Sequence, residues 1–136
     1  MCRIERLAEI AHRAAIQDTD EGCSFLLGAV VAKGSRILAT GACSTKTDPK
    51  NPKLQAKTER WQICAEVRAC LNALRGTASL KGCTVYVVRV TKTGSQYMMA
   101  RPCEHCQRFL KERRVKRVYY SNQHGEIIKM DLFLDP

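Results

Sequence analysis

The sequence predicts an α/β fold in three layers, with a mixed five-stranded sheet between helices on both faces. Segments with helical periodicity alternate with short runs of β-branched and aromatic residues, in the order helix, hairpin, helix, strand, helix, strand. The chain has 136 residues and 45% hydrophobic content, which suffices for one core but not for two. We therefore expect a single domain over residues 1–136.

The N-terminal half predicts a helix followed by a hairpin. Apolar residues recur at spacings of three and four over residues 3–16, which places them on one face of a helix. Two apolar runs follow, SFLLGAVVA and RILATG, separated by Lys33 and Gly34. This arrangement indicates a hairpin with largely buried strands.

The C-terminal half alternates helices and strands. A helical pattern begins at Ile63 and ends at Gly76, and TVYVVRV is a third strand by its β-branched and aromatic content. Residues 91–101 read as a loop, after which Pro102 begins a third helix, PCEHCQRFLKERR. KRVYYS and EIIKMDLF are expected to be the fourth and fifth strands.

The net charge of +10 favours a polyanionic partner such as single-stranded nucleic acid. Basic residues gather in residues 44–60, which include Lys50 and Lys53, and again in residues 101–117. The polar connection over residues 46–60 is long for so small a domain, which is typical of a binding loop. Lys50 and Lys53 are therefore candidate substrate contacts, and a solvated surface is the alternative.

The eight cysteines could indicate a secreted disulfide scaffold, but the N-terminus is charged and amphipathic, without the apolar run of a signal peptide. We therefore expect reduced thiols and a cytoplasmic location. No stretch approaches the roughly 20 apolar residues that cross a bilayer, so no membrane association is expected.

Two short clusters carry candidate chemistry. Cys64-Ala65-Glu66 opens the second predicted helix, and Cys103 and Cys106 open the third. Two cysteines three positions apart at a helical N-terminus direct both sulfurs the same way, so they can bind one ion. A catalytic zinc uses three protein ligands and leaves the fourth position to water. Cys64 would supply the third ligand.

Glu66 lies two positions after a candidate ligand, displaced around the helix from it. We interpret its carboxylate as the general acid/base that takes a proton from the metal-bound water. A His or Cys ligand, a Glu two residues later and a subsequent P-C-x-x-C form the signature of zinc deaminases.

The motifs C-A-E and P-C-x-x-C, each opening a helix with a strand between them, resemble the cytidine deaminase-like superfamily. The resemblance runs from the first helix to KRVYYS and implies a zinc cofactor and hydrolytic deamination of cytosine or adenine. Cys64 as first ligand and the segment FLLGA are similar to the small cytidine deaminases. This resemblance implies that Phe25 lies near the base and that the Ala65 N–H holds the pyrimidine carbonyl. RPCEHCQRFLKERRVKRVYYS is similar to the deoxycytidylate and tRNA-adenosine branch.

Sugar recognition departs from the family pattern. Relatives usually carry a sugar-binding asparagine shortly after the second strand, where this chain has Cys43. Either Ser44 or Thr45 provides that hydrogen bond, or the substrate is held differently. Arg101 precedes Pro102 at the rim of the expected pocket, where a guanidinium can meet a phosphate in a forked geometry.

Because the net charge is strongly positive, we expect the preferred substrate to be cytosine in single-stranded DNA or RNA. The alternatives are free cytidine, deoxycytidine or deoxycytidylate, a tRNA-type adenosine deaminase, and a non-catalytic zinc module that binds nucleic acid. A non-catalytic zinc module would leave Glu66 without a function. A purely structural zinc site would need a fourth ligand, and the candidates are Cys43, Cys70, Cys83 and His105. A homo-oligomer remains open, since free-nucleotide relatives usually form one.

Overall fold

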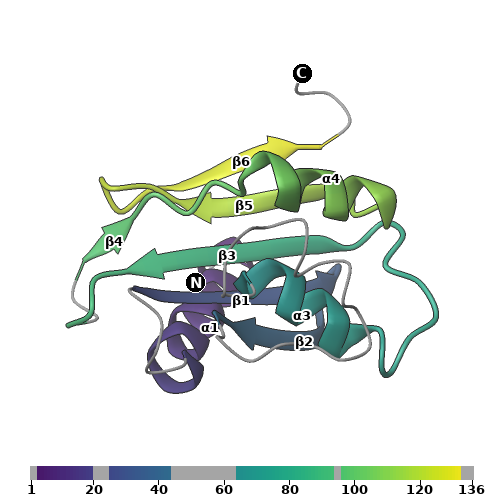
Figure 1. Ribbon diagram of the computed structural model, residues 1–136, viewed down its shortest axis with the longest axis horizontal. Coiled ribbons are helices and arrows are strands. Elements are labelled where there is room, and N and C mark those ends of the chain that lie inside the picture. Colours follow the sequence, from purple (N-terminus) through teal and green to yellow (C-terminus); the bar gives the residue numbers. More distant parts are fainter. Residues whose placement is uncertain (1–2, 20–24, 44–63, 94–95, 133–136) are drawn as a thin grey trace.

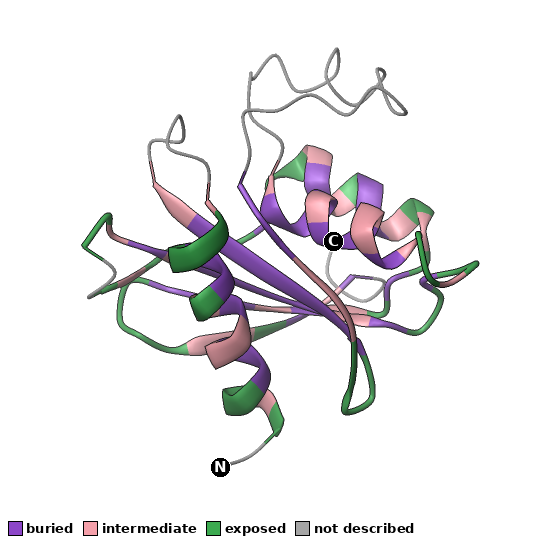
Figure 2. Ribbon diagram, turned by 90° about the horizontal axis from the view of Figure 1, so that it is seen from below, coloured by how far each residue is buried: buried purple, intermediate pink, exposed green. Residues whose placement is uncertain are grey.

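The computed structural model describes residues 3–19, 25–43, 64–93 and 96–132. Its elements in chain order are α1 (Arg3–Asp18), β1 (Leu26–Lys33), β2 (Arg36–Ala42), α3 (Ala65–Ala73), β3 (Thr84–Val90), β4 (Tyr97–Met98), α4 (Glu104–Glu112), β5 (Arg117–Ser121) and β6 (Ile127–Asp131). One sheet lies between α1 on one face and α3 and α4 on the other (Figures 1 and 2). The predicted three-layer α/β fold is confirmed.

The sheet is mixed, as predicted. Its strand order is β2-β1-β3-β5-β6, with β1 antiparallel to both β2 and β3, and β5 parallel to β3. Parallel neighbours need a crossover, which the segment containing α4 provides. The sheet has a sixth strand, because β4 pairs with the end of β3 inside the segment expected to be a loop.

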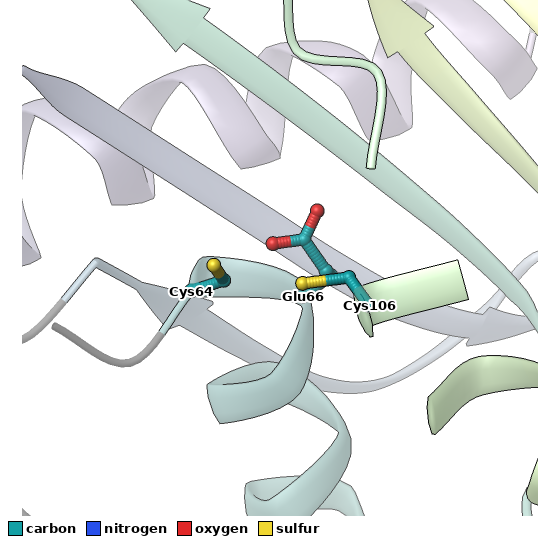
Figure 3. Close-up of side chains that lie close together, drawn as sticks. All are labelled: Cys64, Glu66 and Cys106. Atoms are coloured by element: carbon teal, nitrogen blue, oxygen red, sulfur yellow. The ribbon is translucent and has the colours of Figure 1, made fainter. Parts of the chain in front are cut away.

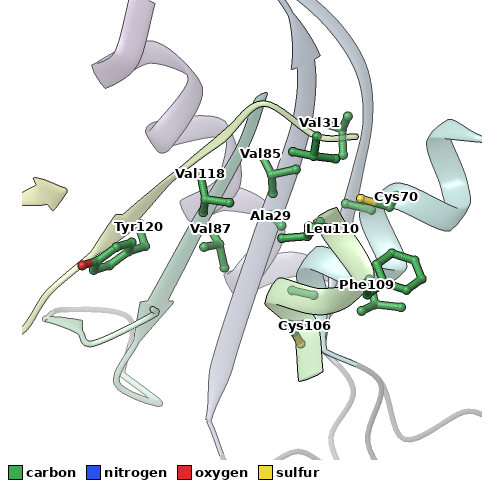
Figure 4. Packing of buried hydrophobic residues seen from close by; sticks show 14 of the residues in the cluster. Ala29, Val31, Cys70, Val85, Val87, Cys106, Phe109, Leu110, Val118 and Tyr120 are labelled. Atoms are coloured by element: carbon green, nitrogen blue, oxygen red, sulfur yellow. The ribbon is translucent and has the colours of Figure 1, made fainter. Parts of the chain in front are cut away.

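Both faces of β3 are buried, because each is covered by a helical layer. Tyr86 and Val88 pack with α1, while Val85 and Val87 pack in the core beneath α3 and α4. Figure 4 shows this second core, with Val85 and Val87 near Leu110 of α4. A strand buried on both faces reads as a continuous apolar run, which is why TVYVVRV was recognisable in the sequence.

Two glycines bring the helices against the sheet. A β-carbon at Gly28 would lie 2.2 Å from the Ala11 carbonyl oxygen of α1. A β-carbon at Gly41 would lie 2.4 Å from the Ala69 nitrogen of α3. Neither distance is compatible with a side chain, so the backbone contact itself requires glycine at both positions.

The helix boundaries differ slightly from those expected. α1 extends to Asp18, two residues beyond the predicted end, and α4 begins at Glu104 rather than Pro102. α3 begins at Ala65, with Cys64 as its N-cap. In the described part of the chain, no helix has both the length and the apolar character needed to span a bilayer.

Candidate active site

The candidate site lies where the N-termini of α3 and α4 meet on the same face of the sheet. Cys64 is the N-cap of α3 and Cys103 is the N-cap of α4, both with extended backbone angles. Neither side chain caps its own helix by a hydrogen bond, so both sulfurs are available to other partners. The first N–H groups of the two helices concentrate positive partial charge here, which favours thiolates.

Three side chains form a compact group at this point. The sulfurs of Cys64 and Cys106 and a carboxylate oxygen of Glu66 all lie within 4.8 Å of one another (Figure 3). Cys106 is 1% exposed and Glu66 is 3% exposed. At this separation the carboxylate can contact either a metal held by the two sulfurs or a water bound to that metal.

Cys103 lies beside this group and completes a set of three thiols. Hydrogen bonds with the Cys106 and Cys64 side chains lower the pKa of Cys103 far below its ordinary value. Hydrogen bonding to Cys103 is the largest cause that raises the pKa of Cys64 and of Cys106, and burial raises both further. These opposite shifts arise because the three thiols share hydrogen bonds with one another.

This donor set fits zinc. Three thiols that share protons can release them to a divalent cation, and thiolate sulfur in a tetrahedral arrangement is a preferred zinc environment. Hard cations such as Mg²⁺ prefer an all-oxygen shell, which these side chains do not offer.

A cavity of about 290 Å³ opens over the cluster. Its lining residues are Phe25, Leu27, Cys64, Glu66, Arg89, Met99, Ala100, Arg101, Pro102, Cys103 and Cys106. The structure thus brings the four residues of the predicted metal and proton-transfer cluster together with the predicted substrate contacts Phe25 and Arg101.

The remaining predicted substrate contacts divide into two groups. Ala65 is fully buried and is the first residue of α3, so its backbone N–H lies at the helix N-terminus next to Cys64. Ser44, Lys50 and Lys53 lie outside the described residues.

Sequence reasoning missed Arg89, Met99 and Ser121. Arg89 and Met99 line the cavity, and the Ser121 hydroxyl donates to the Met98 carbonyl at 2.8 Å. The same hydroxyl accepts a hydrogen bond from the backbone N–H of Arg89 at 3.1 Å. Ser121 therefore links β3 to β4 in the cavity wall. One signal was present, because a charged residue in the apolar run TVYVVRV needs a functional or structural reason.

The other cysteines in the described part of the chain are buried. Cys43, Cys70 and Cys83 are buried, and burial is the largest cause that raises the pKa of Cys70 to about 12. Among the described residues, none of them, nor His105, belongs to the group that could hold a metal. Glu66 is the one further donor that the described residues place in this group, beside the thiols.

Part of the basic run at residues 101–117 has local partners. Arg108 pairs with Glu104 at 3.6 Å, and Arg117 pairs with Asp131 at 3.1 Å. The Arg113 guanidinium lies 3.7 Å from the centre of the Phe109 ring. These three side chains have local partners, in keeping with the solvated-surface alternative, whereas Arg101 lines the cavity.

The fold and the thiol cluster together define an α/β protein with a candidate metal site where the N-termini of two helices meet. A family model for the cytidine and deoxycytidylate deaminase zinc-binding region matches residues 1–122. The chain belongs to this family, whose reaction is the hydrolytic deamination of nucleobases, and its cofactor is zinc.

Solved structures agree on the fold. Cytidine deaminase from Burkholderia pseudomallei is 18% identical, with a TM-score of 0.69, over 94% of this chain and 91% of that chain. Cytidine deaminase from Mycobacterium leprae is 20% identical, with a TM-score of 0.62, over the whole of both chains. The dCMP deaminase of cyanophage S-TIM5 is 22% identical, with a TM-score of 0.61, over 88% of this chain and 82% of that chain. The comparison with curated proteins gave no match.

Proposed function

We propose that the protein converts cytosine to uracil by zinc-dependent hydrolytic deamination. One observation carries this proposal. The Glu66 carboxylate is buried within 4.8 Å of the Cys64 and Cys106 sulfurs, at the edge of a cavity that is open to a substrate. Three thiols already suffice for a catalytic zinc, so a buried carboxylate beside them and next to a cavity supports a role in general acid/base catalysis.

In the proposed site, Cys64, Cys103 and Cys106 would hold the zinc, which would supply a bound water of lowered pKa near neutral pH. Glu66 takes the water proton at its carboxylate oxygen and delivers it to the ring nitrogen next to the amino-bearing carbon. It then carries a second proton to the departing amino group. The balance is cytosine plus water to uracil plus ammonia.

The walls of the cavity orient the base in this proposal. Phe25 lines the cavity and would lie beside the base, and the Ala65 N–H at the start of α3 would donate to the pyrimidine carbonyl. Leu27, Met99 and Pro102 add apolar surface, which excludes water from the reacting atoms.

We propose cytosine in single-stranded DNA or RNA as the first candidate substrate. The net charge of +10 and the basic segment at residues 44–60, which precedes Cys64 closely in sequence, support a polynucleotide backbone at the cavity mouth. Lys50 and Lys53 would then contact phosphates, and binding would weaken steeply with salt.

Free cytidine, deoxycytidine or deoxycytidylate is the second candidate. The cavity of about 290 Å³ supports it, because this volume lies at the small end of small-molecule sites. Two structures of similar fold are described as cytidine deaminases and one as a dCMP deaminase.

The deciding experiment compares cytidine, deoxycytidylate, adenosine and a cytosine-containing single-stranded oligonucleotide side by side on the purified zinc protein. Uracil or ammonia formation from any cytosine substrate supports the proposed reaction. Turnover of the oligonucleotide at low salt supports the first candidate, and turnover of the free forms alone supports the second. A zinc-loaded protein that deaminates none of the cytosine compounds contradicts the proposal.

A further inference from the structure

Arg89 is a charged residue at the end of a strand that is otherwise part of the core. Val85 and Val87 on the same face of β3 pack beneath α3 and α4. Arg89, two residues further along that face, lines the cavity instead. It pairs in register with Leu27 of β1 and Met98 of β4, so its backbone is held by strands on both sides.

The Arg89 guanidinium has unused donor capacity. Its Nε is buried and has no hydrogen-bond partner, and no ion pair joins its guanidinium to an acidic side chain in the described part of the chain. A buried donor without an acceptor is costly, and a solvent-facing arginine would avoid that cost by swinging outward. No acidic partner in the described part of the chain therefore accounts for its place in the cavity.

Phe25 fixes the plane of this guanidinium. The Arg89 guanidinium carbon lies 4.0 Å from the centre of the Phe25 ring. Stacking occupies the face of the guanidinium and leaves its N–H groups at the edge, where they can donate. A planar donor set held in this way is prepared for an oxyanion, because little rotational freedom remains to be lost.

A second guanidinium comes from the same wall of the cavity. Arg101 follows β4 by three residues, and it too lines the cavity. Arg101 is exposed whereas Arg89 is half-buried, so the two charges stand at different depths. Glu66 is the only acidic residue among the described lining residues.

We propose that Arg89 and Arg101 form the phosphate-binding wall of the active site, with Arg89 as the inner residue that selects a phosphorylated cytosine substrate. This inference rests on the proposed function and narrows it to substrates that carry phosphate. The shared chemistry is a nucleotide phosphate, and its source is either a 5′-monophosphate or the phosphodiester of a strand. The base then occupies the zinc side of the cavity while the phosphate meets the β3–β4 wall.

The test compares substrates that differ only in phosphate. The variants are Arg89→Gln, Arg89→Lys and Arg101→Gln. Arg75→Gln is the matched control, an exposed arginine beyond the end of α3 and outside the cavity. The kcat/KM of each is measured on deoxycytidine, deoxycytidylate and a single-cytosine oligonucleotide. Arg89→Gln is expected to lose about 10- to 100-fold with a phosphorylated substrate, the effect of removing a charge-assisted hydrogen bond. Deoxycytidine should change less than about threefold, because it lacks the group bound.

The two phosphate sources give different results. If the monophosphate is bound, deoxycytidylate loses most. If a phosphodiester is bound, the oligonucleotide shows the largest loss of kcat/KM. Arg89→Lys keeps the charge and the side-chain stem but not the fork, so it should fall between wild type and Arg89→Gln. The melting temperature of each variant, compared with that of wild type, shows whether its fold is intact.

A binding measurement separates this inference from the proposed reaction. Calorimetric titration with deoxyuridylate and deoxyuridine requires no turnover. Deoxyuridylate should bind wild type more tightly than deoxyuridine, and Arg89→Gln should remove most of that difference. If these results appear but no cytosine substrate is deaminated, the phosphate site stands and the proposed reaction fails. Equal losses for phosphorylated and unphosphorylated ligands would overturn the phosphate site and indicate that Arg89 acts on the base or on the charge of the metal cluster.

Discussion

Replacing Glu66 with glutamine separates proton transfer from metal binding, because the two side chains have nearly the same shape. The Glu66 carboxylate lies within 4.8 Å of the Cys64 and Cys106 sulfurs. At 4.8 Å, the upper limit of these separations, a carboxylate and a metal-bound thiolate would repel by about 3.5 kcal/mol at an effective dielectric constant of about 20. The amide lacks this charge, so we expect Glu66→Gln to keep one zinc per chain and a melting temperature at or above that of wild type.

Turnover should fall even though the site is intact. The amide has no carboxylate oxygen to accept a proton, and a positioned general acid/base contributes about 100-fold or more. That factor corresponds to about 2.7 kcal/mol of transition-state stabilisation. Zinc content by atomic absorption, thermal unfolding and uracil formation measured by chromatography are the three readouts.

Glu104→Gln is the matched control for this experiment. Glu104 is in the first turn of α4, as Glu66 is in the first turn of α3, but its side chain is 91% exposed and it does not line the cavity. The Glu104→Gln substitution removes the same charge beside the same cluster, and the turnover of this variant should match that of wild type. Near wild-type turnover of Glu66→Gln would refute the proton-transfer role, and loss of zinc in that variant would make Glu66 a ligand instead.

Three further changes test the site and the packing. Cys106→Ala should lose zinc and, with it, stability, because site formation is coupled to folding. Cys70→Ala in the same core should keep its zinc, and equal metal content in the two variants would contradict the assignment. Gly28→Ala puts a β-carbon 2.2 Å from a helix carbonyl and should destabilise the fold by about 1–3 kcal/mol in urea unfolding, so an unchanged midpoint would disprove the close contact. The pKa of Cys70 rises from 9.0 to about 12 on folding, so its contribution to stability is complete below pH 9 and is lost as the pH rises towards 12. Native protein at pH 8 should therefore resist alkylation of Cys70 by iodoacetamide, whereas unfolded protein should not.

The parts of the fold that the sequence predicted are those with strong local patterns. TVYVVRV and KRVYYS are apolar enough to be recognised as strands, and the observed β3 and β5 fall within them. β4 escaped prediction because two residues show no periodicity. It exists through pairing with the end of β3 and through the hydrogen bond from Ser121 to Met98.

The metal cluster was predictable because each half of it is a contiguous motif at a helix N-terminus. Cys64 with Glu66, and Cys103 with Cys106, needed only a fold that brings the two helix starts together. Arg89 was harder to identify, because its relation to Phe25 depends on two neighbouring strands and no spacing in the sequence encodes it. Its charge within an apolar strand was the one available sign.

The two N-cap cysteines have a consequence for the metal-free protein. Helices usually satisfy their first N–H groups with a serine, threonine, aspartate or asparagine side chain, but Cys64 and Cys103 form no such cap. Zinc bound by both sulfurs would tie the starts of α3 and α4 to one point, so a single ion would anchor two helix ends. Its removal should therefore fray both helices from their first turns, and increased amide hydrogen exchange should appear at the starts of α3 and α4 together while the central strands β1 and β3 remain protected.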